Sequence, residues 1–246
     1  MKGNKVNYQP LLIFCGAFSL FFAFWVYLIA SKNPFIKTFD TVVYNAIRNN
    51  NPVERQLAFY WTQVGNTLTI TVFTVVLVLF LVYQRNYIHA VFASLTMIAA
   101  NACNSIIKNI IQRQRPRMDK AVQADGFSFP SGHSVGSMTL ALVLIALIVV
   151  LVKKKPVKTW LIVFCVFFTL SIGFTRMYLH VHWPSDVLGG WCEGLAFSSL
   201  ASCLFFKALD KKNKLKSLIK NLLTCREQIF VCVHILTNPS FAGRYG

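Results

Sequence analysis

The sequence predicts an all-α polytopic membrane protein with about six transmembrane helices and a polar site at the outer-leaflet interface. Hydrophobic residues make up 55% of the 246 residues, charged residues only 13%, and the mean hydropathy is +0.54. A water-soluble domain of this length would need a far larger charged fraction to cover its surface. The apolar residues also fall into six segments, each near the ~20 residues that a helix needs to cross a bilayer. Inside a bilayer the backbone must satisfy its own hydrogen bonds, so each segment is predicted to be a helix.

The six predicted spans are residues 11–30, 67–83, 88–111, 131–152, 160–178 and 187–206. The first apolar run is longer than the core of a secretory signal and ends without a small-residue cleavage pattern, so it is predicted to be a retained span. Between the first and second spans, residues 31–65 carry apolar side chains at helical spacing. This pattern predicts an amphipathic helix at the membrane interface.

These segments predict a six-span domain over residues 1–206, with its polar motifs between residues 108 and 186, followed by a basic amphipathic cytoplasmic tail over residues 207–246. In the tail, residues 211–223 place five Leu and Ile side chains on one helical face, with lysines opposite. Such a helix lies on a membrane surface and is attracted to anionic lipid. A disordered basic tail is the alternative. Residues 229–236 are apolar but too short to span a bilayer, and the sequence indicates no function for residues 228–246.

The formal net charge of +17 admits two classes of anionic partner, nucleic acid and membrane lipid. The basic residues lie between apolar runs, which membrane orientation and anionic lipid explain better than nucleic acid does. When Lys108, Arg115 and Arg176 are set aside as candidate ligands, Lys and Arg favour the side of the two termini by about two to one. Both termini are therefore predicted to be cytoplasmic, which places the polar motifs on the outer face.

The seven cysteines show neither the close pairing of a disulfide framework nor the clustered Cys and His spacing of a zinc site. Most of them lie in apolar segments, as expected of buried structural thiols. No metal or other cofactor is predicted, and the sequence indicates no oligomeric state.

Three polar clusters follow one another at the predicted outer face. Taken singly, a His at an interface is usually structural, and basic residues after a span usually anchor its topology. Arg113, Arg117, Asp119, Asp125 and His180 keep this ordinary interpretation. Taken together on one face, the three clusters predict a single site. Its members are Lys108, Arg115-Pro116, Pro130-Ser131-Gly132-His133, Arg176, His182 and Asp186.

The residue types in these clusters fit a phosphate ester. Phosphoryl transfer spreads negative charge over the phosphate oxygens, and Lys108, Arg115 and Arg176 supply fixed positive charges. Ser131 and Gly132 lie at the start of the fourth span, where backbone N–H groups and the helix dipole favour an anion. The site is therefore predicted to hold a phosphate.

Two histidines suit a transfer without a metal, in which one imidazole attacks phosphorus and the other protonates the departing oxygen. His182 and Asp186 are four residues apart around Pro184, a residue type favoured at the first helical position. Asp186 is predicted to hold one nitrogen of His182 and to leave the other free to attack. This casts His133 as the acid.

In these motifs the chain resembles the type 2 phosphatidic acid phosphatase superfamily, which also includes vanadium haloperoxidases and glucose-6-phosphatase. The family pattern is Lys-x6-Arg-Pro, Pro-Ser-Gly-His and Ser-Arg-x5-His-x3-Asp, and only Thr175 departs from it, in place of Ser. The resemblance covers residues 108–186, about a third of the chain. It implies a phosphohistidine intermediate on His182, with His133 as general acid and no metal. It also implies an all-helical core with the site at the outer leaflet.

The resemblance makes a metal-independent hydrolase of a lipid phosphate or diphosphate in a bacterial plasma membrane the expected function. Undecaprenyl diphosphate, phosphatidylglycerophosphate and phosphatidic acid are the candidate substrates, and the sequence does not choose among them. A vanadate-dependent haloperoxidase-like enzyme is an alternative, disfavoured because those proteins are soluble. A non-enzymatic lipid-binding or transport protein is another, and the intact His133, His182 and Asp186 argue against it.

Overall fold

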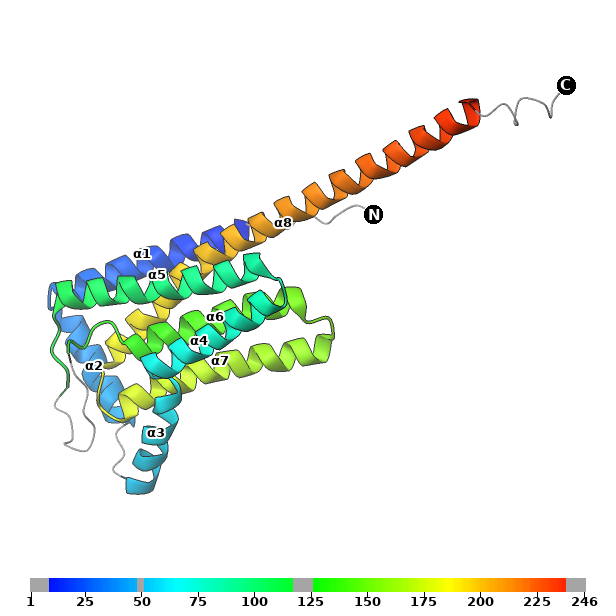
Figure 1. The fold of residues 1–246 in the computed structure, drawn as a ribbon. Coiled ribbons are helices and arrows are strands. Elements are labelled where there is room, and N and C mark those ends of the chain that lie inside the picture. The colour runs from blue at the N-terminus through cyan, green and yellow to red at the C-terminus, as the bar shows by residue number, and fades with distance from the viewer. Residues whose placement is uncertain (1–8, 48–50, 117–125, 238–246) are drawn as a thin grey trace. The chain divides into compact units, whose positions relative to one another are not determined.

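The computed structural model describes residues 9–47, 51–116 and 126–237, with side chains described up to residue 219. Every regular element in these ranges is a helix (Figure 1). The predicted all-α fold class is thereby confirmed, whereas Arg117, Asp119 and Asp125 lie outside the described residues. The helices are α1 (Gln9–Ala30), α2 (Pro34–Ile47), α3 (Pro52–Val64), α4 (Thr67–Tyr83), α5 (Tyr87–Ile111), α6 (Gly132–Leu151), α7 (Lys155–Tyr178) and α8 (Pro184–Thr237).

Six helical stretches in the described part of the chain are long and apolar enough to cross a membrane, as predicted. They are α1, α3 together with α4, α5, α6, α7 and the first part of α8. Their outer surfaces carry exposed apolar side chains, such as Leu68, Val72 and Val76 of α4. Such surfaces are expected of helices that face lipid instead of water.

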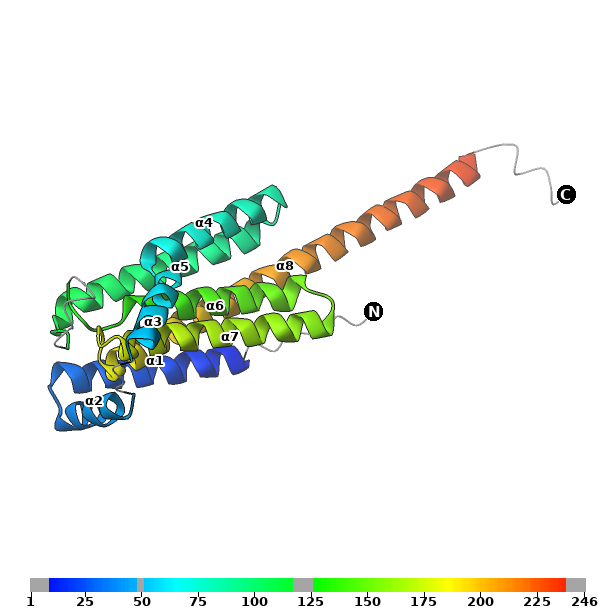
Figure 2. The same ribbon diagram turned by 90° about the horizontal axis from the view of Figure 1, so that it is seen from below.

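The most enclosed of these helices is α6, which packs against α4, α5 and α7 (Figure 2). Two glycines allow α8 to approach it closely. A Cβ atom at Gly190 would lie 2.8 Å from the carbonyl oxygen of Ser131, and one at Gly194 would lie 2.9 Å from Cβ of Met138. Small residues serve such close helix packing in membranes. The contact brings the start of α8 against the start of α6, and with it the second and third sequence clusters.

The interval between the first two spans folds into α2 and α3. In α2, the predicted amphipathic helix, Ile36 and Asp40 are the buried residues. The ring of Phe39 packs edge-on against Trp25 of α1, with 5.7 Å between centroids. The indole Nε1 of Trp25 in turn donates a hydrogen bond of 3.0 Å to the carbonyl oxygen of Ser185. In this way α1 and α2 support the start of α8.

Helix boundaries differ from the prediction by more than three residues at two places. The helix α7 begins at Lys155 and not at residue 160, because Pro156 fits the first turn of a helix. The helix α8 begins with Pro184 at its first position, as predicted, but the backbone stays helical past residue 206, as far as Thr237. Neither Gly nor Pro occurs between residues 195 and 237, so the sequence has no helix-breaking residue there.

The described chain divides into a main unit that ends at Phe205 and a second unit that begins at Phe206. In the second unit, Nζ of Lys214 lies 2.9 Å from Oδ2 of Asp210, and Leu215, Leu218 and Ile219 are exposed. Binding of this helix to anionic lipid, and the role of residues 207–246 as a cytoplasmic tail, stay predictions.

The helix ends that carry the three clusters lie together in the main unit. The C-terminal ends of α1, α5 and α7 and the N-terminal ends of α6 and α8 meet at one end in both views (Figures 1 and 2). The turns from α4 to α5 and from α6 to α7 lie at the opposite end. The three clusters therefore share one end of the helical bundle.

Candidate active site

The eight residues with a predicted catalytic or phosphate-binding role all lie at this shared end. Six of them cap a helix or occupy its first or last turn, where backbone groups lack partners within the helix and are open to other ligands. The other two lie in connecting segments. In chain order, Lys108 lies in the last turn of α5, Arg115 follows that helix, Ser131 caps α6 ahead of Gly132 and His133, Arg176 lies in the last turn of α7, His182 follows it, and Asp186 lies in the first turn of α8.

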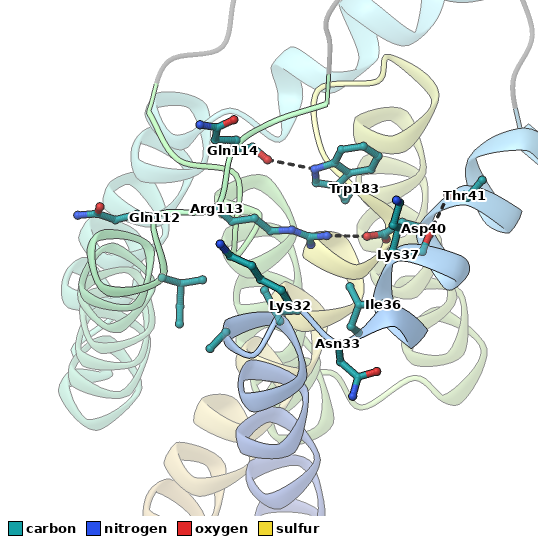
Figure 3. A pocket seen from close by; sticks show the side chains of 13 residues that line it. Lys32, Asn33, Ile36, Lys37, Asp40, Thr41, Gln112, Arg113, Gln114 and Trp183 are labelled. Atoms are coloured by element: carbon teal, nitrogen blue, oxygen red, sulfur yellow. Dashed lines mark hydrogen bonds and ion pairs between the residues drawn. The ribbon is translucent and has the colours of Figure 1, made fainter.

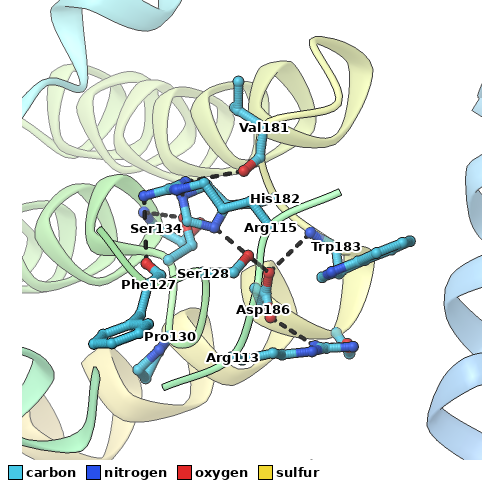
Figure 4. Close-up of polar contacts among 12 residues, drawn as sticks. Arg113, Arg115, Phe127, Ser128, Pro130, Ser134, Val181, His182, Trp183 and Asp186 are labelled. Carbon is cyan, nitrogen blue, oxygen red and sulfur yellow. Dashed lines mark hydrogen bonds and ion pairs between the residues drawn. The ribbon is translucent and has the colours of Figure 1, made fainter. Parts of the chain in front are cut away.

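The guanidinium of Arg115 is fixed between two segments of the site (Figure 4). Its Nη1 donates to the carbonyl oxygen of Val181 at 2.9 Å and lies 3.0 Å from Nε2 of His182. Its Nε and Nη2 donate to the carbonyl oxygens of Gly126 and Phe127 at 3.0 and 3.3 Å. A guanidinium cannot accept a hydrogen bond, so Nε2 of His182 is the acceptor in this contact.

The carboxylate of Asp186 lies on the other side of the His182 ring. Nδ1 of His182 is 3.5 Å from Oδ2 of Asp186, and both side chains are buried. The same oxygen accepts hydrogen bonds from the hydroxyl of Ser128 and, at 2.8 Å, from the main-chain N–H of Trp183 (Figure 4). The geometry therefore places the ring proton on Nδ1 and the lone pair on Nε2.

Burial lowers the pKa of His182 to about 4, and the nearby Asp186 opposes this shift. Desolvation penalises the charged imidazolium more than the neutral ring, which is why the pKa falls. The imidazole is consequently neutral at pH 7, the state that a nucleophile requires.

The other carboxylate oxygen of Asp186 is bound by Arg113, which corrects the interpretation of Arg113 as a topology anchor. Nη1 of Arg113 lies 2.6 Å from Oδ1 of Asp186, and Nη2 lies 2.6 Å from Oδ2 of Asp40 on α2. Ser185 completes the group, donating to Asp40 from its main-chain N–H at 2.8 Å and from its hydroxyl at 2.9 Å. Burial raises the pKa of Asp40, and Arg113 opposes the shift.

One predicted role of Ser131 is wrong. Its main-chain N–H donates to the carbonyl oxygen of Asp186 at 3.1 Å, so it is not free to bind a phosphate. Its hydroxyl oxygen caps α6 instead, accepting from the main-chain N–H of Ser134 at 3.4 Å and from the hydroxyl of Ser134 at 2.9 Å. The amides of Gly132 and His133 remain the candidate anion donors at this helix start.

The Lys108 ammonium lies over the start of α6. A Cβ atom at Gly132 would lie 3.9 Å from Nζ of Lys108 and 3.6 Å from Oδ1 of Asn104. Glycine leaves this approach open to a ligand of the size of a phosphate oxygen. The lysine and the helix start therefore face the same small space.

The side chain of His133 is half-buried in the first turn of α6. Lys108, Arg115, Arg176 and His182 all lie close enough to act on its charge. Three cations and two imidazoles thus lie close together at this end of the bundle.

Arg176 is held by α3, a helix outside the motifs. Its side chain is buried, and its Nη1 donates to the hydroxyl of Thr62 at 3.0 Å. This hydrogen bond to α3 fixes the orientation of the Arg176 guanidinium.

A buried acid lies behind the start of α6. Oε2 of Glu193 accepts from Nδ2 of Asn104 at 3.3 Å, and the same nitrogen lies 3.5 Å from the carbonyl oxygen of Pro130. Glu193 is fully buried in α8. Glu193 could have been noticed in the sequence, because an acidic residue inside a predicted span is rare unless it has a partner.

The model of the PAP2 superfamily matches residues 89–210, which contain all three motifs. The chain belongs to the PAP2 superfamily. Within it, the chain is 26% identical to lipid A 4'-phosphatase of Bacteroides thetaiotaomicron, over 76% of this chain and 71% of that protein.

A further relative and a solved structure of similar fold come from Bacillus subtilis. Phosphatidylglycerophosphatase B is 37% identical, over 45% of this chain and 53% of that protein, so the match spans about half the length of the relative. The crystal structure of a transmembrane PAP2 type phosphatidylglycerolphosphate phosphatase superposes with a TM-score of 0.70 at 23% identity, covering 80% of this chain and 96% of the other. This last likeness shows a shared fold.

Proposed function

We propose that this PAP2 protein hydrolyses a phosphate or diphosphate ester of a membrane lipid through a phosphohistidine on His182. The observation that carries the proposal is the placement of the His182 imidazole, with Nδ1 directed at Asp186 and Nε2 at Arg115. Membership of the superfamily and the relatives named as phosphatases support the reaction class.

In the first step, the lone pair on Nε2 of His182 forms a bond to phosphorus while the bond from phosphorus to the lipid oxygen breaks. The departing oxygen takes the bonding pair and a proton from His133. The negative Asp186 stabilises the positive charge that develops on the ring of His182. When the substrate binds, the N–H group of Arg115 that contacts Nε2 donates its hydrogen bond to a phosphate oxygen instead. Lys108 and Arg176 bind the other phosphate oxygens.

In the second step, water attacks the phosphorus and gives a proton to His133, which is neutral after the first step. The bond from Nε2 to phosphorus breaks, its electrons return to His182, and inorganic phosphate leaves. With a diphosphate substrate the same steps release a lipid monophosphate in the first step. His133 therefore acts as acid and then as base.

The substrate is proposed to keep its tail in the bilayer while its head group enters the site at the ends of the helices. The expected side is the outer face of a bacterial plasma membrane, which the distribution of Lys and Arg supports. The candidate substrates remain undecaprenyl diphosphate, phosphatidylglycerophosphate and phosphatidic acid.

The test is phosphate release by the purified full-length protein in detergent micelles, measured for each of these three lipids. We expect release from at least one of them, and loss of release in His182→Ala. Halide oxidation with added vanadate is measured in parallel. Absence of phosphate release from every lipid, or equal release by His182→Ala, would contradict the proposal.

A further inference from the structure

A pocket of about 660 Å³ lies beside the site, where α1 ends, α2 begins and residues 112–114 follow α5 (Figure 3). The side chains of Lys32, Lys37, Asp40, Arg113 and Trp183 are on its walls. Its walls are the ends of α1 and α5, the first half of α2 and connecting segments, so the candidate spans place the pocket at the expected level of lipid head groups and not of lipid tails. None of its lining residues belongs to the predicted phosphate site.

The charges on the walls favour an anion. Within residues 9–47, 51–116 and 126–219, the ammonium groups of Lys32 and Lys37 form no ion pair or hydrogen bond. Asp40, the carboxylate that lines the pocket, is already bound by Arg113 and Ser185. Figure 3 shows the two ammonium groups turned toward the side of Arg113 and Trp183. Cationic groups grouped in this way suit a phosphate, which accepts several charge-assisted hydrogen bonds.

The pocket and the reacting nitrogen lie on opposite sides of Asp186. Arg113, on the pocket wall, binds Oδ1 of Asp186, while His182 faces Oδ2. Nε2 of His182 points away from Asp186, toward Arg115. A phosphate that reacts at Nε2 therefore does not occupy the pocket, and an anion in the pocket is a second group.

We propose that this pocket binds a second phosphate-bearing lipid head group, distinct from the phosphate that is hydrolysed. The distinction between the two phosphates rests on the proposed function, whereas the anion binding rests on the pocket alone. The amide side chains of Asn33, Gln112 and Gln114 also line it and suit the hydroxyl groups of a polyol or sugar. The second phosphate belongs either to another part of the substrate's own head group or to a neighbouring anionic lipid.

A binding measurement tests the pocket without any turnover. Soluble dihexanoyl phosphatidylglycerol is titrated by calorimetry into His182→Ala protein, because a phosphodiester of this kind is not a substrate of the proposed reaction. In this background, Lys32→Gln with Lys37→Gln should weaken binding about tenfold, since each basic residue near a membrane surface contributes a severalfold attraction. Thr41→Trp, which fills the pocket without changing charge, should weaken it as well.

The matched control removes the same charge elsewhere. Lys153 and Lys154 are exposed in the turn from α6 to α7, at the other end of α6. Lys153→Gln with Lys154→Gln should leave binding unchanged. The proposal is overturned if the control pair weakens binding as much as Lys32→Gln with Lys37→Gln, or if neither pair nor Thr41→Trp changes it.

Kinetics then distinguish the two sources of the second phosphate. If it is part of the substrate, Lys32→Gln with Lys37→Gln should raise KM about tenfold for phosphatidylglycerophosphate in neutral micelles and leave KM for phosphatidic acid unchanged. If the second phosphate belongs to a neighbouring lipid, added phosphatidylglycerol should lower KM for phosphatidic acid in the wild-type protein. The variant Lys32→Gln with Lys37→Gln should not show this lowering. An inactive wild-type protein would reject the proposed function and leave the binding result to decide on the pocket.

Discussion

The guanidinium of Arg113 lies 2.6 Å from the carboxylate of Asp186, on the side of that carboxylate away from His182. The same guanidinium reaches Asp40 of α2, so the position of Asp186 depends on a helix that carries none of the motifs. Arg113 is therefore a positioning residue, which acts on the reaction through Asp186.

With phosphatidic acid as substrate, substitution of Arg113 should lower kcat while leaving KM nearly unchanged. Arg113→Gln removes the partner of two buried carboxylates, and a loss of roughly 10- to 100-fold is expected when the support of a catalytic group is removed. Arg113→Lys keeps the charge but loses the planar fork that joins two carboxylates, so it should be impaired too. Steady-state kinetics are read together with the thermal midpoint of the detergent-solubilised protein. Wild-type kcat in a stable Arg113→Lys variant would remove Arg113 from this role.

His182→Ala should abolish turnover, by roughly 10³-fold or more, because it removes the nucleophile. Wild-type protein quenched during turnover of a ³²P-labelled substrate should carry an acid-labile label that His182→Ala lacks. Retention of the label by His182→Ala would place the intermediate on another residue.

The pH dependence should report the buried imidazole. Because the pKa of His182 is lowered to about 4, kcat/KM should fall as the pH drops through about 4, and not near the ordinary value of 6.5. The folded state binds fewer protons than the unfolded chain between these two values. The free energy of unfolding should therefore decrease as the pH falls from 6.5 toward 4. An acid limb centred at 6.5 in a fully folded protein would contradict the assignment.

Phosphate release should persist in EDTA, because Lys108, Arg115 and Arg176 are proposed to provide the positive charge that a metal supplies elsewhere. The measurement is phosphate release after dialysis against the chelator, with and without added Mg²⁺ or Zn²⁺. Activity that is lost on dialysis and restored by one of these ions would show that the mechanism needs a metal.

Cysteine labelling tests the proposed orientation in a background from which the seven native cysteines have been removed. Val53→Cys, exposed on α3 at the site end of the main unit, should react with a membrane-impermeant maleimide in intact cells. Lys153→Cys, in the turn at the opposite end, should react only after lysis. The reverse pattern would invert the topology.

The sequence was sufficient for the fold class and for the grouping of the motifs. Six apolar segments define the spans because the bilayer admits only helices of that length. The motifs lie at helix ends that all face the same side of the predicted membrane. Their convergence therefore follows from the alternating direction of the spans. The contact of Arg115 with His182 and of His182 with Asp186 agrees with the predicted grouping.

The supporting contacts were not predicted, because they join residues far apart in the chain. Arg113 and Asp40 are 73 residues apart and Asn104 and Glu193 are 89 apart. Local patterns do not reveal such partners. Asp40 does have a local signal, since it lies four residues after Ile36 on the buried face of α2. The hydrogen bond from the Ser131 amide to the carbonyl oxygen of Asp186 could not be predicted from the sequence either, because it depends on the close approach of α8 to α6.

Three residues that precede the matched family segment contact it directly: Trp25 binds Ser185, Asp40 binds Arg113, and Thr62 binds Arg176. A fragment limited to residues 89–210 would retain every motif and lose all three supports. An active fragment is therefore expected to need nearly the whole main unit. Truncation or domain-grafting designs should preserve α1, α2 and α3 even though none of them carries a catalytic side chain.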